Sequence, residues 1–165
     1  MQDPGIKKLV EKAMNVHHNS YAPYSNVHVA AAVEADDGTI YTGVNVENAS
    51  YGLTICAERA AVAAMVAAGR RRIARVAIVA DTPEPLPPCG ACRQVLAEFG
   101  DQETLVVSVS TKTGRRQSWR LGELLPYAFT AGHIEGTGAR TPLPKGLHSG
   151  RSGGLGTGQP PHSPG

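Results

Sequence analysis

The chain has three cysteines, and all of them lie in two short segments, T-I-C-A-E-R at 54–59 and P-C-G-A-C-R-Q at 88–94. Zinc prefers four tetrahedral nitrogen or sulfur ligands, and a catalytic zinc site leaves one of these positions to water. Cys56, Cys89 and Cys92 supply three ligands and leave the fourth position open. Side chains three residues apart point the same way from a helix, which suits the last two cysteines. We therefore predict one Zn²⁺ ion per subunit, held by three thiolates.

Glu58 follows the first cysteine by two residues, so both side chains reach one metal only where the chain enters a helix. Thr54 is the expected N-cap of that helix, because the alanine-rich run after it favours helix. In this position Glu58 can take a proton from a metal-activated water and pass it to a substrate. Three thiolates leave a zinc site negatively charged, and two helix N-termini together with Arg59 offset that charge.

The same residues have other interpretations. The cysteines can be buried, inert apolar residues, or ligands of a closed structural zinc site in which His28 is the fourth ligand. Glu58 can be a solvated carboxylate on a helix. We favour the catalytic interpretation, because it accounts for the glutamate and the arginine as well as for the cysteines.

Length and composition restrict the class of protein. With 165 residues, 41% of them hydrophobic, the chain can bury a core of its own. A net charge of +2 and an aromatic content of 5% argue against a nucleic-acid surface, and Arg70–Arg72 fit a solvated helix end better than a nucleic-acid patch. No signal peptide, membrane span or disulfide framework is expected, and the thiols need a reducing compartment. We therefore expect a soluble cytoplasmic protein with no nucleic-acid or membrane partner.

Hydrophobic periodicity and turn residues predict the remaining elements. Asp3 is the expected N-cap of the first helix, and Asp37-Gly38 is the expected hairpin turn. Helices are expected over 3–18, 55–68 and 89–99, with a last helical turn over 124–129, and strands over 27–34, 39–46, 73–80, 105–110 and 117–121. This order of strands and helices indicates an α/β protein, a three-layer α/β/α sandwich with a mixed five-stranded sheet.

The composition changes near Thr130, after which Gly, Pro, Ser and Thr dominate. Such a segment buries too little apolar surface to offset the entropy lost on ordering it. We therefore expect residues 1–130 to form the catalytic domain and residues 131–165 to form a disordered tail.

Five segments in order resemble the cytidine deaminases of the small homotetrameric type. They are Y-A-P-Y-S at 21–25, G-V-N-V-E-N-A-S-Y at 43–51, T-I-C-A-E-R-A-A at 54–61, P-C-G-A-C-R-Q-V-L-A-E-F at 88–99 and E-L-L-P-Y-A-F at 123–129. The resemblance implies a homotetramer that converts cytidine and 2′-deoxycytidine to uridine and 2′-deoxyuridine in pyrimidine salvage. It also implies that hydroxide attacks C4 of the base, while Glu58 protonates N3 and then assists the loss of ammonia.

The resemblance also assigns residues that bind substrate. On the residues alone, Asn45 and Glu47 are solvated polar groups at a strand end, and Phe129 is a phenylalanine that caps the core. By resemblance, Asn45 and Glu47 bind the ribose 3′-hydroxyl, and the backbone N–H of Ala57 holds the base. Tyr51 and Phe129 act in a neighbouring subunit's site, where the phenylalanine stacks on the pyrimidine.

Two positions depart from the pattern of the family. Val27 stands where relatives usually carry a phenylalanine that lines the base pocket, and Ala30 stands where they carry glycine. The smaller Val27 removes apolar contact area worth about 1–2 kcal/mol, so we expect a roomier base pocket. Alternative functions are therefore a deaminase of a modified cytidine or another aminated nucleoside, and a non-catalytic zinc-binding assembly module, which would not need Glu58.

Overall fold

The structure is a computed structural model, and it describes residues 3–135 of the chain. The helices are α1 (Pro4–Val16), η1 (His17–Asn19), η2 (Tyr51–Leu53), α2 (Ala57–Ala67), α3 (Gly90–Phe99), α4 (Leu121–Leu124) and α5 (Ala131–Glu135). The strands are β1 (Val29–Ala35), β2 (Ile40–Val44), β3 (Ile73–Ala80), β4 (Leu105–Ser110) and β5 (Arg116–Arg120). None of the helices within residues 3–135 combines the length and apolar character needed to cross a membrane.

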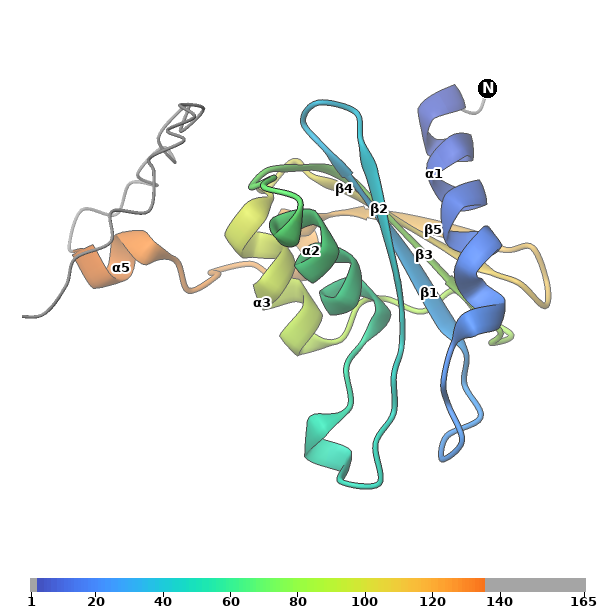
Figure 1. Cartoon of the computed structure of the whole chain (residues 1–165). Coiled ribbons are helices and arrows are strands. Elements are labelled where there is room, and N and C mark those ends of the chain that lie inside the picture. Colours follow the sequence, from blue (N-terminus) through green and yellow to red (C-terminus); the bar gives the residue numbers. More distant parts are fainter. Residues whose placement is uncertain (1–2, 136–165) are drawn as a thin grey trace, which may run out of the picture.

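The five strands form one mixed sheet in the order β2-β1-β3-β4-β5. Only β3 and β4 are parallel, because α3 crosses over between them, and the other neighbouring pairs are antiparallel. Figure 1 shows α2 and α3 on one face of the sheet and α1 on the other. This arrangement confirms the predicted three-layer α/β/α sandwich.

Each face of the sheet has its own buried core. On one face, Leu9 and Ala13 of α1 pack on small residues of β1 and β3, including Ala30 and Ala77. On the other face, α2 and α3 cover Val33, Ile78 and Val106, among other residues. The buried side of α1 is thus formed by apolar residues, and Asp3 is its N-cap as predicted, with Oδ1 accepting from Gly5 N at 2.9 Å.

The helix that carries Glu58 lies in backbone contact with the sheet. A Cβ atom on Gly43 of β2 would stand 2.4 Å from Ala61 N and 2.5 Å from Ala57 O, so only glycine fits there. The alanine-rich surface of α2 permits this close approach. The start of α2, where Cys56 and Glu58 lie, is therefore held at a fixed height above the sheet edge.

Helix α2 begins later than predicted, and Cys56 rather than Thr54 is its N-cap. The reason is a contact between distant residues: Val46 and Ile55 exchange both backbone hydrogen bonds at 2.9 Å. This pairing keeps residue 55 extended, while the Thr54 side chain accepts from Asn48 N at 3.3 Å. The helix therefore starts at Ala57, between the cysteine and the glutamate.

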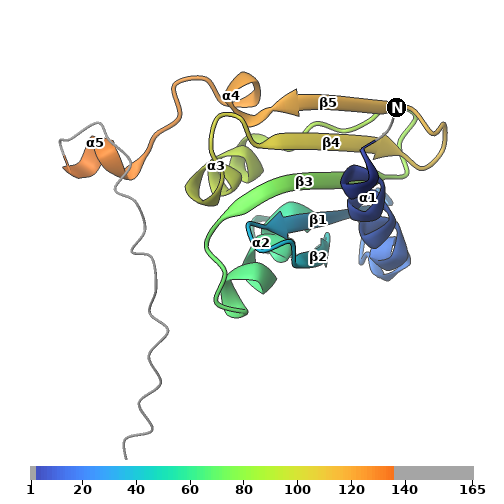
Figure 2. The same ribbon diagram turned by 90° about the horizontal axis from the view of Figure 1, so that it is seen from above.

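The C-terminal end of the described chain differs from the prediction in two respects. The last helical turn, predicted over 124–129, lies instead at Leu121–Leu124, where the backbone N–H of Arg120 donates to Glu123 Oε2 at 2.6 Å. Pro126 disfavours helix at the residue before it, so the chain then leaves the body of the domain. Helix α5 lies within the segment predicted to be disordered, and it stands apart from the sheet in both Figure 1 and Figure 2. Residues 136–165 of the predicted tail lie outside the described residues.

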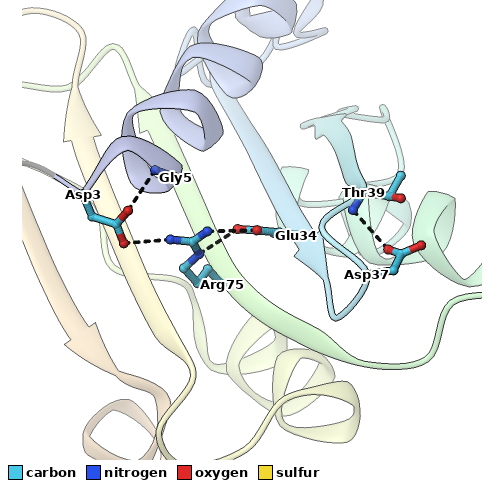
Figure 3. Close-up of polar contacts among 6 residues, drawn as sticks. All are labelled: Asp3, Gly5, Glu34, Asp37, Thr39 and Arg75. Carbon is cyan, nitrogen blue, oxygen red and sulfur yellow. Dashed lines mark hydrogen bonds and ion pairs between the residues drawn. The ribbon is translucent and has the colours of Figure 1, made fainter.

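Arg75 connects α1 to the sheet through two carboxylates, as Figure 3 shows. Its guanidinium donates to both oxygens of Glu34, at 2.7 and 2.9 Å, and to Asp3 Oδ2 at 2.8 Å. Figure 3 also shows the β1–β2 turn, where Asp37 accepts from Thr39 N at 3.1 Å. Glu34 and Asp3 together raise the pKa of Arg75, so the cation is fixed at the N-cap of α1.

Replacing Arg75 by Met should lower the free energy of unfolding by about 1–3 kcal/mol, because it leaves the Glu34 carboxylate, only 15% exposed, without its partner. Urea unfolding measures this change. The matched control is Lys7→Met, since Lys7 and Glu11 are 67% and 60% exposed and their pair contributes about 0–1 kcal/mol. Equal effects of the two substitutions would show that the Arg75 network adds nothing to stability.

The basic run after α2 is used within the domain. Arg70 pairs with Asp37 of the β1–β2 turn at 2.8 Å, and Arg71 donates to the carbonyl of Val66 at 2.8 Å. Cations at the end of a helix also interact favourably with its dipole. These contacts support the helix-end interpretation of the arginine run.

Candidate metal centre and substrate site

The three cysteine sulfurs meet at the N-termini of two helices. Cys56 is the N-cap of α2, Cys89 is the N-cap of α3, and Cys92 lies in the first turn of α3. All three sulfurs lie within 4.8 Å of one another, and those of Cys56 and Cys89 are 3.8 Å apart. Within residues 3–135 this cluster includes no histidine, so the closed site with His28 as fourth ligand is not formed.

The cluster fits a zinc ion. Tetrahedral coordination with Zn–S bonds of about 2.3 Å places two sulfurs about 3.8 Å apart, which is the separation of Cys56 and Cys89. With three sulfur ligands and no fourth side chain in the cluster, one coordination position remains for water or substrate. The arrangement is that of a catalytic rather than a structural zinc site.

The surroundings of Cys56 favour its thiolate. The Cys92 thiol and the Arg59 guanidinium hydrogen-bond to the Cys56 sulfur and lower its pKa to about 5. Arg59 lies 3.8 Å from that sulfur and is anchored by the Thr54 carbonyl at 2.9 Å. The hydrogen bond to Cys56, and after it burial, raise the pKa of Cys92, and a bound metal would take the place of the shared proton. The predicted role of Arg59 beside the thiolates agrees with this geometry.

Glu58 is buried in the first turn of α2, beside the cysteine cluster. Burial is the largest influence on its carboxyl and raises the pKa, and its other neighbours include Cys56, Cys92 and Arg59. Interpreting it as a solvated helix carboxylate is therefore wrong. A carboxyl with a raised pKa next to a metal centre is suited to accepting and returning a proton.

Asn45 and Glu47 lie after the end of β2, and both side chains form hydrogen bonds within the chain. The Asn45 amide is buried and hydrogen-bonded to Ser20, Val27 and Val29. Glu47 Oε1 accepts from the backbone N–H groups of Tyr24 at 2.9 Å and Ser25 at 3.1 Å. Hydrogen bonds from Ser25 and Tyr24 lower the pKa of Glu47, so the carboxylate is charged and oriented.

An open pocket of about 360 Å³ adjoins this carboxylate. It is lined by Tyr24, Ser25, Glu47, Tyr51 and Thr54. Tyr24 and Tyr51 meet edge to face, with ring centroids 5.8 Å apart. The pocket thus combines one oriented carboxylate with two aromatic rings, a mixture of aromatic lining and a placed polar group that is typical of small-molecule sites.

The remaining predicted residues divide into two groups. Ala57 is buried at the start of α2, and Val27 is half-buried, with its carbonyl accepting from the Asn45 amide at 2.9 Å. Tyr51 and Phe129, in contrast, are 75% and 61% exposed, and Phe129 does not line the pocket beside Glu47. The interpretation of Phe129 as a core-capping residue is wrong, since the ring stacks on His133 of α5, with centroids 5.7 Å apart.

Sequence reasoning missed two residues directly after Cys92. Arg93 donates to the carbonyls of Pro88 and Leu124, each at 2.8 Å, and Gln94 donates to the Phe129 carbonyl at 2.8 Å. They connect the helix that carries two cysteines to the C-terminal segment. Their only signal in the sequence is their place beside the cysteine motif, because their partners in the C-terminal segment, Leu124 and Phe129, are 31 and 35 residues away.

Comparison with known proteins agrees with the site. Residues 5–108 match the family described as cytidine and deoxycytidylate deaminase zinc-binding region. The cytidine deaminase of Halalkalibacterium halodurans is 47% identical over 74% of this chain and 92% of its own length. That of Sporosarcina psychrophila is 43% identical over 76% of this chain and 91% of its own.

Solved structures give the same result. Cytidine deaminase from Burkholderia pseudomallei is 46% identical over 74% of this chain and 98% of its own, with a TM-score of 0.71. The enzyme from Mycobacterium tuberculosis is 44% identical over 77% and 98%, with a TM-score of 0.66. The fold and the three-cysteine centre define a zinc-binding deaminase domain. Within that class, the chain belongs to the cytidine and deoxycytidylate deaminase family.

Proposed function

We propose that this chain catalyses the hydrolytic deamination of cytidine and 2′-deoxycytidine to uridine and 2′-deoxyuridine, with one zinc ion per subunit. The observation that carries the proposal is the buried Glu58 carboxyl beside a cluster of three thiols at two helix N-termini. A structural zinc module has no need of that carboxyl. The names of the similar proteins support the same reaction.

In this reaction Cys56, Cys89 and Cys92 would hold the zinc, which when bound would supply a water acidic enough to act as the nucleophile at C4 of the base. Glu58 takes the proton of the attacking water and gives it to N3. It then takes the remaining proton from the new hydroxyl on C4 and gives it to the amino group, so that the bond from C4 to that nitrogen breaks, ammonia leaves and C4 becomes a carbonyl. The Ala57 N–H at the start of α2 holds the base, and Arg59 reduces the negative charge of the thiolates.

The sugar site favours a nucleoside over a nucleotide. Glu47 has one oxygen bound by backbone N–H groups and the other available to the ribose 3′-hydroxyl, together with Asn45. The pocket residues include a carboxylate with a lowered pKa and no lysine or arginine. A 5′-phosphate near this carboxylate would meet charge repulsion and no cation to offset it.

We further propose a cytoplasmic homotetramer that acts in pyrimidine salvage. Large apolar side chains are exposed in two segments: Tyr51, Leu53 and Ile55 before α2, and Tyr127 and Phe129 after α4. Surfaces of this kind mark contacts between subunits, and Tyr51 and Phe129 would then complete a neighbour's site. Free cysteines that serve as metal ligands require a reducing compartment.

The fall in ultraviolet absorbance on mixing zinc-loaded protein with cytidine tests the proposal, and light scattering measures the oligomer. We expect turnover from the wild type and a mass four times that of the chain. No turnover from a folded, zinc-loaded tetramer, with cytidine or with modified nucleosides, would leave the non-catalytic module as the explanation.

Val27 provides the reason to test modified nucleosides. Replacing it by Phe should restore apolar contact with the base, lower the KM for cytidine by about tenfold, and penalise bases substituted at C5 or N4. The kcat/KM ratio of cytidine to 5-methylcytidine measures this change. Ala30→Gly is the matched control, because Ala30 is buried in the core under α1 and does not line the pocket beside Glu47. An unchanged ratio in the Val27→Phe variant would show that this side chain does not contact the base.

A further inference from the structure

The Asn45 side chain has almost all of its hydrogen-bonding capacity occupied within the chain. Its Oδ1 accepts from Ser20 Oγ and from Val29 N at 2.9 Å, and its Nδ2 donates to the Val27 carbonyl at 2.9 Å. Val29 N can only donate and Val27 O can only accept, so the orientation of the amide is unambiguous. The amide is also buried.

A count of donors and acceptors shows what remains for a ligand. A carboxamide has two acceptor sites on oxygen and two hydrogens on nitrogen. Ser20 and Val29 occupy both acceptor sites of Asn45, and Val27 occupies one of the hydrogens. One N–H is therefore left, and a sugar hydroxyl that meets this amide must accept from it. Glu47, with one carboxylate oxygen outside its two backbone hydrogen bonds, supplies the acceptor for the hydroxyl proton.

The backbone holds Ser20 beside the Asn45 side chain. The Ser20 N–H caps η1 by donating to His17 O at 3.1 Å. The next residue, Tyr21, donates to Asn45 O at 3.0 Å and accepts from Glu47 N at 2.9 Å. The backbone around Ser20 is thus paired with the segment that carries both proposed sugar ligands. No other side chain fills the second acceptor site of the Asn45 oxygen in the described part of the chain.

We propose that Ser20 is a positioning residue for the sugar site. By donating to Asn45 Oδ1 it closes that oxygen to the ligand and turns the amide into a donor toward the nucleoside 3′-oxygen. Asn45 then donates to the oxygen of the 3′-hydroxyl, and Glu47 accepts the hydroxyl proton. This inference rests on the proposed function, and it concerns the nucleoside sugar rather than the chemistry at C4.

The test compares nucleosides that differ only at the 3′ position. Ser20→Ala removes one neutral hydrogen bond, so we expect the KM for 2′-deoxycytidine to rise about 3- to 10-fold with kcat unchanged. The inhibition constant of 2′,3′-dideoxycytidine, which lacks the 3′-hydroxyl, should not change. Ser20→Thr retains the hydroxyl and should restore the KM of the wild type.

Ser118→Ala on the exposed strand β5 is the matched control, and we expect no effect from it. Equal weakening of both nucleosides in Ser20→Ala, or no weakening of either, would overturn the role of Ser20 while leaving the deaminase activity in place. A Ser20→Thr variant as weak as Ser20→Ala, at unchanged thermal stability, would overturn it too. A wild-type protein that turns over no cytidine nucleoside would overturn the proposed function, and this inference with it.

Discussion

Glu58→Gln is expected to bind zinc and to fold, yet to lower kcat for cytidine by about 10²- to 10⁴-fold, the usual contribution of a positioned acid–base group. Glutamine has nearly the same shape but cannot take a proton from water and return it to the base. Glu58 is buried beside the cysteines, and the metal cluster within residues 3–135 consists of the three cysteines and holds no carboxylate that could replace it. Absorbance assays of the zinc-loaded variant measure the loss.

The matched control is Glu98→Gln, since Glu98 is exposed on α3, the second helix of the metal centre. It should have wild-type kinetics and wild-type zinc content. If Glu58→Gln kept more than about a tenth of wild-type kcat with full zinc content, the proton transfer would have to be assigned to another group.

Glu58→Gln also has a predictable effect on the stability of the zinc-free protein. Burial raises the pKa of Glu58 above its usual value of 4.5, so the folded state disfavours the charged form. The group therefore stabilises the fold fully below pH 4.5, and this stabilisation is lost as the pH rises through the raised pKa. Glu58→Gln should remove that loss, so its free energy of unfolding should exceed that of the wild type at neutral pH. Lower activity with higher stability is the result expected for a residue kept for catalysis.

Local sequence was sufficient to predict the metal centre. Three cysteines and one glutamate at close spacing limit the chemistry because each residue type is a strong metal ligand or proton carrier. The requirement that Cys56 and Glu58 sit at a helix entrance followed from helical geometry, and the structure confirms it. The sheet followed equally well, since its strands alternate with helices and its hairpin carries an Asp-Gly turn.

Contacts between distant residues account for the errors. Thr54 has the right chemistry for an N-cap, but pairing of Ile55 with Val46 moved the cap to Cys56. The roles of Gln94 and Ser20 depend on partners 35 and 25 residues away, which no local pattern reveals. The core-capping alternative for Phe129 fails, because composition alone cannot show that the chain leaves the domain after α4 and leaves this ring 61% exposed.

Cys89→Ala is expected to abolish tight zinc binding and, with it, turnover of cytidine. It removes one of only three protein ligands, yet Cys89 is exposed, so little packing is lost. Cys92→Ala removes a ligand that is also fully buried. Comparing the two variants therefore separates the contribution of the metal to stability from the contribution of core packing.

Thermal and urea unfolding with and without zinc measure the two contributions. Zinc at about 1,000 times its Kd should stabilise the wild type by about 4 kcal/mol, and neither variant should gain as much. In the absence of zinc, Cys89→Ala should unfold within about 0.5 kcal/mol of the wild type, as surface substitutions do. Cys92→Ala should be less stable than either in the absence of zinc, because it leaves a small cavity under α3.

Zinc content measured on the same samples shows whether the metal centre needs all three thiolates. If Cys89→Ala kept one zinc per chain with wild-type affinity, a water or a residue outside the cluster would have to replace the thiolate, and the three-thiolate centre would be wrong. Loss of zinc from both variants, with loss of core stability from Cys92→Ala alone, is the pattern that the exposed and buried positions of the two sulfurs require. It would also show that the sulfur cluster is needed for metal binding rather than for holding the two helices together.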